Sequence, residues 1–149
     1  MSSSKAAEIS EKPIDMQKAV QLLGGNTRLF YNMLGKLESM SLVPSMKGIA
    51  DAMVAEDYLD MKAKAHSLKG ASGYIGASNV HYSCFQIQAQ FEAKNFPGMI
   101  EYYPMLVESA IEFKIACRTI LAENKGKFKA TVVLTLFESL YSRSESGNR

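Results

Sequence analysis

The sequence predicts an all-α protein, an antiparallel four-helix bundle with one or two additional N-terminal helices. Apolar residues recur every three or four positions through most of residues 16–120, the spacing of one helix face. Turn-forming residues interrupt this pattern at short intervals, and no segment before residue 130 alternates as a strand would. Amphipathic helices with short connections pack most simply as an antiparallel bundle.

The composition is that of an ordinary globular protein. Its 149 residues, 47% hydrophobic and 21% charged, suffice for one domain with a modest core. The 17 basic and 15 acidic side chains leave a formal net charge of +2, which gives no reason to expect a nucleic-acid partner. No apolar run approaches the roughly 18 residues that span a membrane, and the polar start is unlike a secretory signal. We expect a monomer in the cytoplasm, and the sequence does not decide whether the protein also enters the nucleus.

The first helices are bounded by capping and turn residues. Asp15 is a suitable N-cap for a short helix that Gly24 and Gly25 stop, and Asn26 can cap the next. Pro44 interrupts or restarts that second helix before its apolar stripe continues. The apolar positions of these helices are Met16, Val20, Leu23, Leu29, Phe30, Met33, Leu34, Leu37, Met46, Ile49, Ala50 and Met53.

The next helix opens at Glu56-Asp57, because acidic residues suit a first turn, and it ends at Gly76. Lys64 falls on its inward side, where it must either snorkel or pair with Asp60 one turn back. The apolar residues predicted to face inward are Met61, Leu68, Ala71 and Ile75.

Two further helices complete the predicted bundle. Ser78 is a suitable cap for the first, and residues 95–98 break the chain before the last long helix. Because Pro104 lies within the last apolar pattern, we expect the helix proper to begin near residue 102 after a short turn. The two apolar stripes are Val80, Cys84, Ile87 and Phe91, then Met99, Tyr103, Leu106, Ala110, Phe113, Cys117 and Ile120.

A histidine stands on the predicted outer face of the helix that Asp57 opens. On a helical wheel His66 points to water, Lys62 and Lys69 lie beside it, and Gly70 and Gly73 follow one and two turns later. Each glycine inside a helix costs about 1 kcal/mol relative to alanine. Close approach of another protein to the imidazole would explain that cost. The pattern therefore indicates a histidine presented to a partner, with lysines that could hold a dianionic group on the ring.

This segment resembles the phosphoacceptor motif of histidine-containing phosphotransfer (HPt) domains, Ala-His-x-Leu-Lys-Gly followed by small residues and a glycine. The matching residues are Ala65, His66, Leu68, Lys69, Gly70, Ala71, Ser72 and Gly76. The resemblance covers roughly residues 13–123. It implies a four-helix bundle that accepts a phosphoryl group on His66 from a receiver-domain aspartate and passes it to another receiver domain.

The resemblance also implies roles for residues around His66. A side chain larger than Gly70 would obstruct a docking receiver, and Gln88 matches a glutamine near the acceptor histidine in fungal members. Met16, together with Ile14, would form part of an apolar docking patch. Fungal members have an acidic residue where this chain has Phe85. Apart from the resemblance, Gln88 could equally be a polar residue at a helix edge.

The implied partners are receiver domains of hybrid sensor histidine kinases and of response regulators. The receiver would supply Mg²⁺, and no cofactor is expected on this chain. The sequence has no nucleotide-binding loop, kinase signature or metal-ligand cluster, so the phosphoryl group must come from a partner. We expect a phosphocarrier without kinase activity. His81 is interpreted as structural, and Cys84 and Cys117 as reduced, buried thiols.

Two other functions are considered. One is an adaptor that binds receivers without being phosphorylated, and the other is a helical scaffold that acts through the apolar run at residues 131–141. A full hybrid kinase is excluded by length, although the chain could be a fragment of one.

The predicted domain organisation has three parts. Residues 1–12 are polar and expected to be disordered, and residues 13–123 form the HPt domain. Residues 124–149 form an extension that could be an extra helix packed on the bundle, a partner-binding segment or an aggregation-prone tail.

Overall fold

The computed structural model describes the backbone of residues 12–146 and the side chains of residues 12–124. The elements are α2 (Met16–Leu22), α3 (Thr27–Lys36), the π-helical segment η1 (Leu37–Leu42), α4 (Val43–Val54), α5 (Tyr58–Tyr74), α6 (Ser78–Glu92) and α7 (Phe96–Ser146). The predicted disorder at the N-terminus falls almost entirely outside the described residues.

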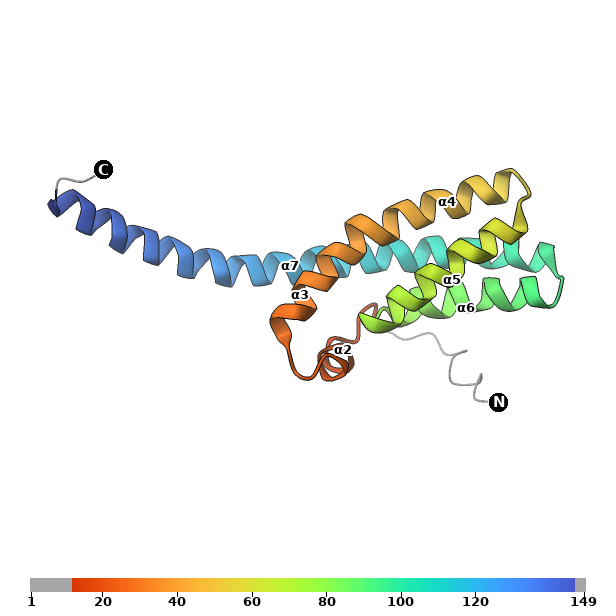
Figure 1. Cartoon of the computed structure of the whole chain (residues 1–149), viewed down its shortest axis with the longest axis horizontal. Coiled ribbons are helices and arrows are strands. Elements are labelled where there is room, and N and C mark those ends of the chain that lie inside the picture. Colours follow the sequence, from red (N-terminus) through yellow and green to blue (C-terminus); the bar gives the residue numbers. More distant parts are fainter. Residues whose placement is uncertain (1–11, 147–149) are drawn as a thin grey trace. The chain divides into compact units, whose positions relative to one another are not determined.

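The chain divides into two compact units, residues 1–117 and 118–149. In the first, α4, α5, α6 and the beginning of α7 form a bundle in which short turns reverse the chain, and α2 and α3 precede it (Figure 1). The described residues contain no strand. The predicted all-α bundle with additional N-terminal helices is therefore confirmed. In the second unit the backbone is helical as far as Ser146, and the side chains of the predicted apolar run lie outside the described residues.

The predicted N-terminal caps of the first two helices are present. The Asp15 side chain accepts a hydrogen bond from the backbone N–H of Lys18 at 3.1 Å. The Asn26 side chain accepts one from Leu29 at 3.0 Å. Each cap satisfies a backbone donor that has no partner within its helix. Leu29 itself is 40% exposed, so it does not belong to the core stripe predicted for α3.

Pro44 does not end the helical backbone, but the segment just before it is a π-helix rather than an α-helix. The α3 helix passes directly into η1, and Pro44 lies in the first turn of α4. A proline has no N–H to donate, and its ring clashes with the carbonyl one turn earlier. The wider π turn accommodates both effects. Leu37 and Leu42, at the two ends of η1, are buried and keep the segment on the core.

The α5 helix buries a wider face than one apolar stripe. It packs against both α4 and α6, so two sides of the helix are covered. Ala65 and Ser72 are buried, whereas Ala71, predicted to face inward, is only half-buried. The Ser72 hydroxyl donates to the carbonyl of Leu68 at 2.6 Å, which satisfies it within the helix. The largest fully buried side chains of the core are Phe30, Leu34, Leu42, Ile49, Met61, Leu68, Ile75, Val80, Ile87, Met99, Leu106 and Phe113.

Lys64 reaches the edge of this core by pairing with Asp60, one of the two predicted solutions. Its Nζ lies 2.7 and 2.8 Å from the two carboxylate oxygens of Asp60. Both side chains are partly exposed, so the charge is partnered without being fully removed from water.

Several predicted helix ends are wrong by a few residues. Asp57 caps α5, but Glu56 lies outside the helix at φ 58°. Ser78 is the first residue of α6 rather than its cap, because the turn at Gly76 is so tight that the helix starts at once. The α7 helix begins at Phe96, not near residue 102, because the Asn95 side chain accepts from the N–H of Gly98 at 3.1 Å.

Pro104 lies inside α7 without ending it. An interior proline costs about 3 kcal/mol or more through one lost hydrogen bond and a steric clash. Met99 and Leu106, on either side of Pro104, are fully buried. We infer that their burial offsets that cost and holds the helix continuous.

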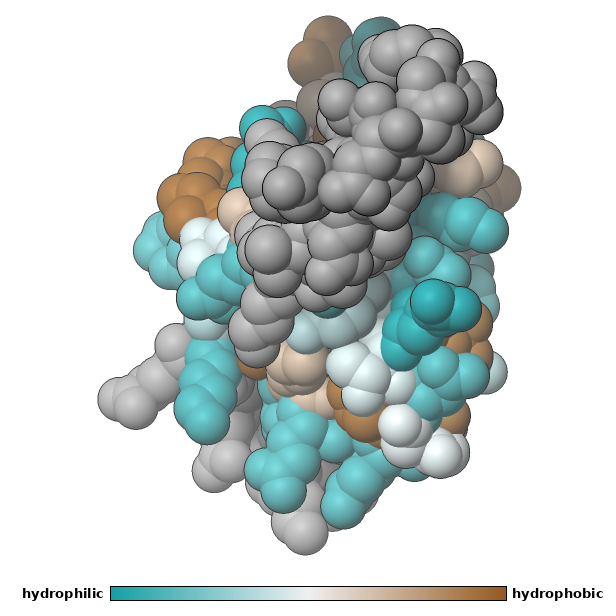
Figure 2. Space-filling model, turned by 90° about the vertical axis from the view of Figure 1, so that its left-hand side faces the viewer, coloured by the Kyte–Doolittle hydropathy of each residue, from teal (hydrophilic) through white to brown (hydrophobic). Residues whose placement is uncertain are grey.

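The surface drawn in Figure 2 is mainly hydrophilic where it is described, with hydrophobic residues in small separate groups. Within the described part of the chain, no helix is long and apolar enough to cross a membrane.

We predict opposite effects of alanine at two glycines of this region. Gly76 has φ +76°, and a Cβ there would lie 2.5 Å from the carbonyl oxygen of Asp15. Gly76→Ala should therefore lower the free energy of unfolding by about 1–3 kcal/mol. Gly70 lies inside α5, and a Cβ added there would meet no atom within 4 Å. Gly70→Ala should raise the free energy of unfolding by about 0.5–1 kcal/mol. Urea unfolding of both variants measures the difference, and equal midpoints would contradict this account of the turn.

Candidate functional site

The site is centred on His66, an exposed residue near the middle of α5. The helix is anchored at its start by the Asp57 side chain, which accepts from the N–H of Asp60 at 3.1 Å. Ala65 and Leu68, on the other side of the helix, are completely buried. The backbone under the histidine is therefore fixed, and the imidazole projects to solvent as predicted.

Gln88 on α6 makes a hydrogen bond with the His66 ring. The Gln88 Oε1 atom lies 3.1 Å from His66 Nδ1. An amide oxygen accepts hydrogen bonds and cannot donate them, so Nδ1 carries the hydrogen in this pair. Nε2 then has the free lone pair. The geometry thus orients the ring and leaves one nitrogen available as a nucleophile.

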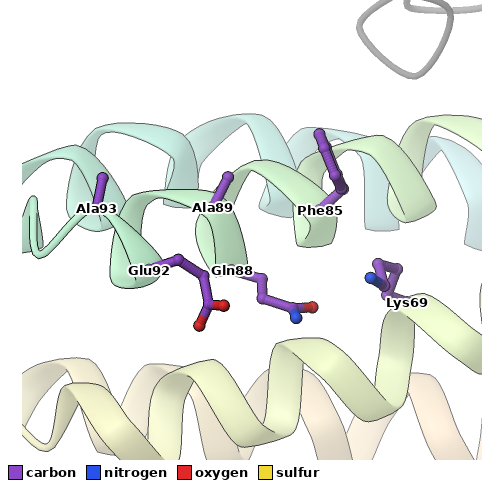
Figure 3. A pocket seen from close by; sticks show the side chains of 6 residues that line it. All are labelled: Lys69, Phe85, Gln88, Ala89, Glu92 and Ala93. Atoms are coloured by element: carbon purple, nitrogen blue, oxygen red, sulfur yellow. The ribbon is translucent and has the colours of Figure 1, made fainter. Parts of the chain in front are cut away.

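Lys69 and Phe85 meet beside this pair. Lys69 Nζ lies 5.8 Å from the centroid of the Phe85 ring, within the range of a cation–π contact. Both residues line an open hollow of about 450 Å³. Figure 3 places Lys69 on α5 and the other side chains on α6 and at Ala93, the residue directly after it. The lining residues are Lys69, Phe85, Gln88, Ala89, Glu92 and Ala93.

Lys62 lies at a second aromatic group. Its Nζ is 5.3 Å from the centroid of the Phe91 ring. Phe91 in turn lies 6.0 Å from Phe96, which stacks on Tyr58 at 4.8 Å between ring centroids. Lys62 does not line the hollow next to Gln88. Its predicted role near a phosphoryl group stays a prediction.

The two glycines of the predicted open face have different surroundings. Gly70 is exposed, and a Cβ added there would have no neighbour within 4 Å, which leaves this side of α5 clear. Gly73 is half-buried, and a Cβ there would lie 3.3 Å from His81 Nδ1. His81 Nδ1 also lies 2.9 Å from the carbonyl oxygen of Lys69. Gly73 therefore makes room for His81, which bonds α6 to α5, and the predicted role of Gly73 in receiver docking stays a prediction.

The predicted apolar docking patch on the first helix is only partly available. Met16 is half-buried on α2, whereas Ile14 is only 7% exposed. The N–H of Asp15 donates to the carbonyl of Gly76 at 2.8 Å, which holds this segment against the α5–α6 turn. Ile14 is thereby drawn into the core, and the interpretation of Ile14 as a docking residue is wrong.

Sequence reasoning did not find Glu92 in the hollow, nor the contact between Lys69 and Phe85. The sequence contains one indication of this grouping. Phe85, Gln88 and Glu92 are spaced by three and four residues, which places them on the same face of α6. Which part of α5 faces these residues depends on the packing of the two helices. The described residues include no group of three His, Cys, Asp or Glu that could hold a metal ion.

Comparison with known proteins identifies the family. A family model described as Hpt domain matches residues 38–113, about half of the chain. The chain belongs to the HPt domain family. The matched range contains α5 and α6 and hence His66 and Gln88, but it is narrower than the 13–123 resemblance predicted from sequence.

One curated relative of this HPt chain is histidine-containing phosphotransfer protein 2 of Arabidopsis thaliana. It is 30% identical over 77 residues, which are 52% of this chain and 47% of that protein. The chain thus spans about half the length of the curated relative it matches. No solved structure matches the chain.

The Cys84 thiol, directly behind this site, should be unreactive in the folded protein. Burial raises the pKa of Cys84 from 9.0 to about 12, although the Lys69 charge opposes the shift. At pH 8 the folded protein should contain roughly a thousandfold less Cys84 thiolate than the unfolded chain. The labelling rate of the folded protein should be lower by at least the same factor. A disulfide reagent measures the labelling rates of the folded and the denatured protein, in the Cys117→Ser variant so that Cys84 is the one cysteine left. The folded-state rate should rise about tenfold per pH unit towards pH 12. Rapid labelling of the folded protein at pH 8 would contradict the burial argument.

Proposed function

We propose that this chain accepts a phosphoryl group on His66 from a receiver-domain aspartate and passes it to another receiver domain in a His-Asp phosphorelay. The observation that carries the proposal is the exposed His66 ring with its Nδ1 atom held by Gln88. Membership of the HPt family and the name of the Arabidopsis relative support it.

The chemistry follows from the tautomer that Gln88 selects. The Nε2 lone pair attacks phosphorus, the Nε2–P bond forms, and the bond between phosphorus and the partner's aspartyl oxygen breaks. The aspartate leaves as a carboxylate, and the ring becomes an imidazolium that keeps its hydrogen on Nδ1. No proton has to leave the site. Because the ring becomes positive, the hydrogen bond from Nδ1 to Gln88 Oε1 should strengthen during transfer.

Lys69 supplies positive charge next to the transferred group. It lies one turn after His66 on α5 and lines the hollow beside Gln88. Phosphoryl transfer depends mainly on in-line positioning and on neutralising charge. An ammonium group held there would favour the dianionic phosphoryl group on Nε2.

The partners we infer are receiver domains of hybrid sensor histidine kinases and of response regulators. The receiver would contribute the aspartate and a Mg²⁺ ion. In this assignment the HPt chain is a phosphocarrier that presents His66, while the partner brings the metal.

Replacing His66 should abolish phosphoryl uptake without unfolding the protein. His66→Gln changes an exposed side chain, so circular dichroism and the thermal midpoint should stay near those of the wild type. Both proteins are incubated with a phosphorylated receiver and Mg²⁺, and acid-labile phosphate is followed on each. We expect label on the wild type alone, with NMR locating phosphorus on Nε2. Absence of label on the wild type with several receivers would favour the adaptor function. Equal labelling of the variant would place the acceptor elsewhere.

Bulk at Gly70 should hinder docking of the receiver. Gly70 is exposed and its surroundings are open, so Gly70→Gln should fold normally while its side chain occupies the approach to His66. We expect transfer roughly tenfold slower, which corresponds to about 1.4 kcal/mol. Lys47→Gln, at an exposed position of α4, is the control for adding glutamine to the surface. Unchanged transfer kinetics in Gly70→Gln would show that receivers do not approach over this residue.

A further inference from the structure

Phe85 and Lys69 connect α6 to α5 at the edge of the hollow beside Gln88. We propose that Phe85 is a positioning residue for phosphotransfer: its ring holds the Lys69 ammonium beside His66 without neutralising the positive charge. The inference rests on the function proposed above and assigns to Phe85 a role that it exerts through Lys69.

The placement follows from helix geometry. Phe85 precedes Gln88 by three residues on α6, so the two side chains project from neighbouring positions of that helix. Lys69 follows His66 by three residues on α5. The pair Lys69–Phe85 thus lies one turn along from the pair His66–Gln88, and both pairs bridge the same two helices. Figure 3 displays Lys69 at the α5 side of this hollow, near Gln88.

The type of contact that Lys69 makes determines whether its positive charge remains available. A carboxylate partner attracts an ammonium group more strongly than a ring does, but it also offsets the positive charge. An aromatic face attracts a cation through its quadrupole and has no net charge of its own. The Lys69 charge therefore stays available to the phosphoryl group. Glu92, the carboxylate that lines the same hollow, makes no ion pair with Lys69 within 4.0 Å among the described side chains.

Holding the Lys69 side chain in place also reduces the conformational entropy that it loses on contact with a phosphoryl group. A free lysine samples many rotamers and loses that freedom when it contacts a phosphoryl group. The ring, 5.8 Å from Nζ, already restricts Lys69 to the side of α5 that faces Gln88. Such preorganisation favours the phosphorylated state without any change in the fold.

The experiment measures the phosphotransfer equilibrium between one receiver and four HPt proteins: wild type, Phe85→Leu, Phe85→Tyr and Lys69→Gln. Phe85→Leu removes the ring but leaves an apolar side chain, whereas Phe85→Tyr keeps the ring as a matched control. We expect Phe85→Leu to shift the equilibrium about threefold towards the receiver, in line with a partly exposed cation–π contact. Phe85→Tyr should retain the wild-type value.

A double variant distinguishes positioning from packing. If Phe85 acts through Lys69, Phe85→Leu should cause no further shift in the Lys69→Gln background. A threefold shift that persists without Lys69, or an unchanged equilibrium in Phe85→Leu alone, would overturn the inference.

A measurement on the unphosphorylated protein separates this inference from the proposed function. The Lys69 Hε protons should resonate upfield in the wild type and Phe85→Tyr, because they lie near a ring, and should lose that shift in Phe85→Leu. If the shift is present but no receiver phosphorylates the wild type, the proposed function fails. If the wild type is phosphorylated but Lys69 Hε has an ordinary shift, the positioning role fails.

Discussion

The packing of α5 between α4 and α6 is the constraint on which the rest of the structure depends. It buries Ala65 and Leu68, which flank His66 in sequence, and so leaves the histidine only one direction in which to project. The Ser72 hydroxyl is also buried on this helix, but it donates to the Leu68 carbonyl and so needs no partner from another helix. A site fixed on a packed helix needs no loop to position its reactive group.

The polar groups of the site are held mainly by uncharged partners. Gln88 fixes His66 through an amide oxygen, and aromatic rings receive the Lys69 and Lys62 ammonium groups. Neutral partners restrict these side chains while leaving their charges and lone pairs available. The interior directly behind is strongly apolar: burial raises the pKa of Cys84 to about 12 even though the Lys69 charge acts in the opposite direction. The site thus combines an apolar interior with two lysine ammonium groups and the Glu92 carboxylate at the surface.

Most of the helical framework could be predicted because its signals are local. Asp15 and Asn26 cap their own helices, and the pattern of apolar residues from Met99 to Cys117 marks the face of α7 that is buried. Some of the errors occurred where a distant contact overrides a local signal. The burial of Met99 and Leu106 accompanies a helix that continues through Pro104, and the α5–α6 turn draws Ile14 inward through the backbone bond of Asp15.

For the site, the sequence by itself determined which face of α5 carries the exposed histidine and which residues of the family motif accompany it, because helical periodicity is a property of one segment. Tertiary structure alone decided two pairs between helices, Phe85 with Lys69 and His81 with the space left by Gly73. The family resemblance had placed Gln88 near the histidine, and the structure added the atoms through which it bonds the His66 ring. Those pairs depend on the rotation and axial shift of α6 against α5. Both quantities are set by how buried side chains such as Leu68, Cys84 and Ile87 fit together, and no single segment encodes that fit.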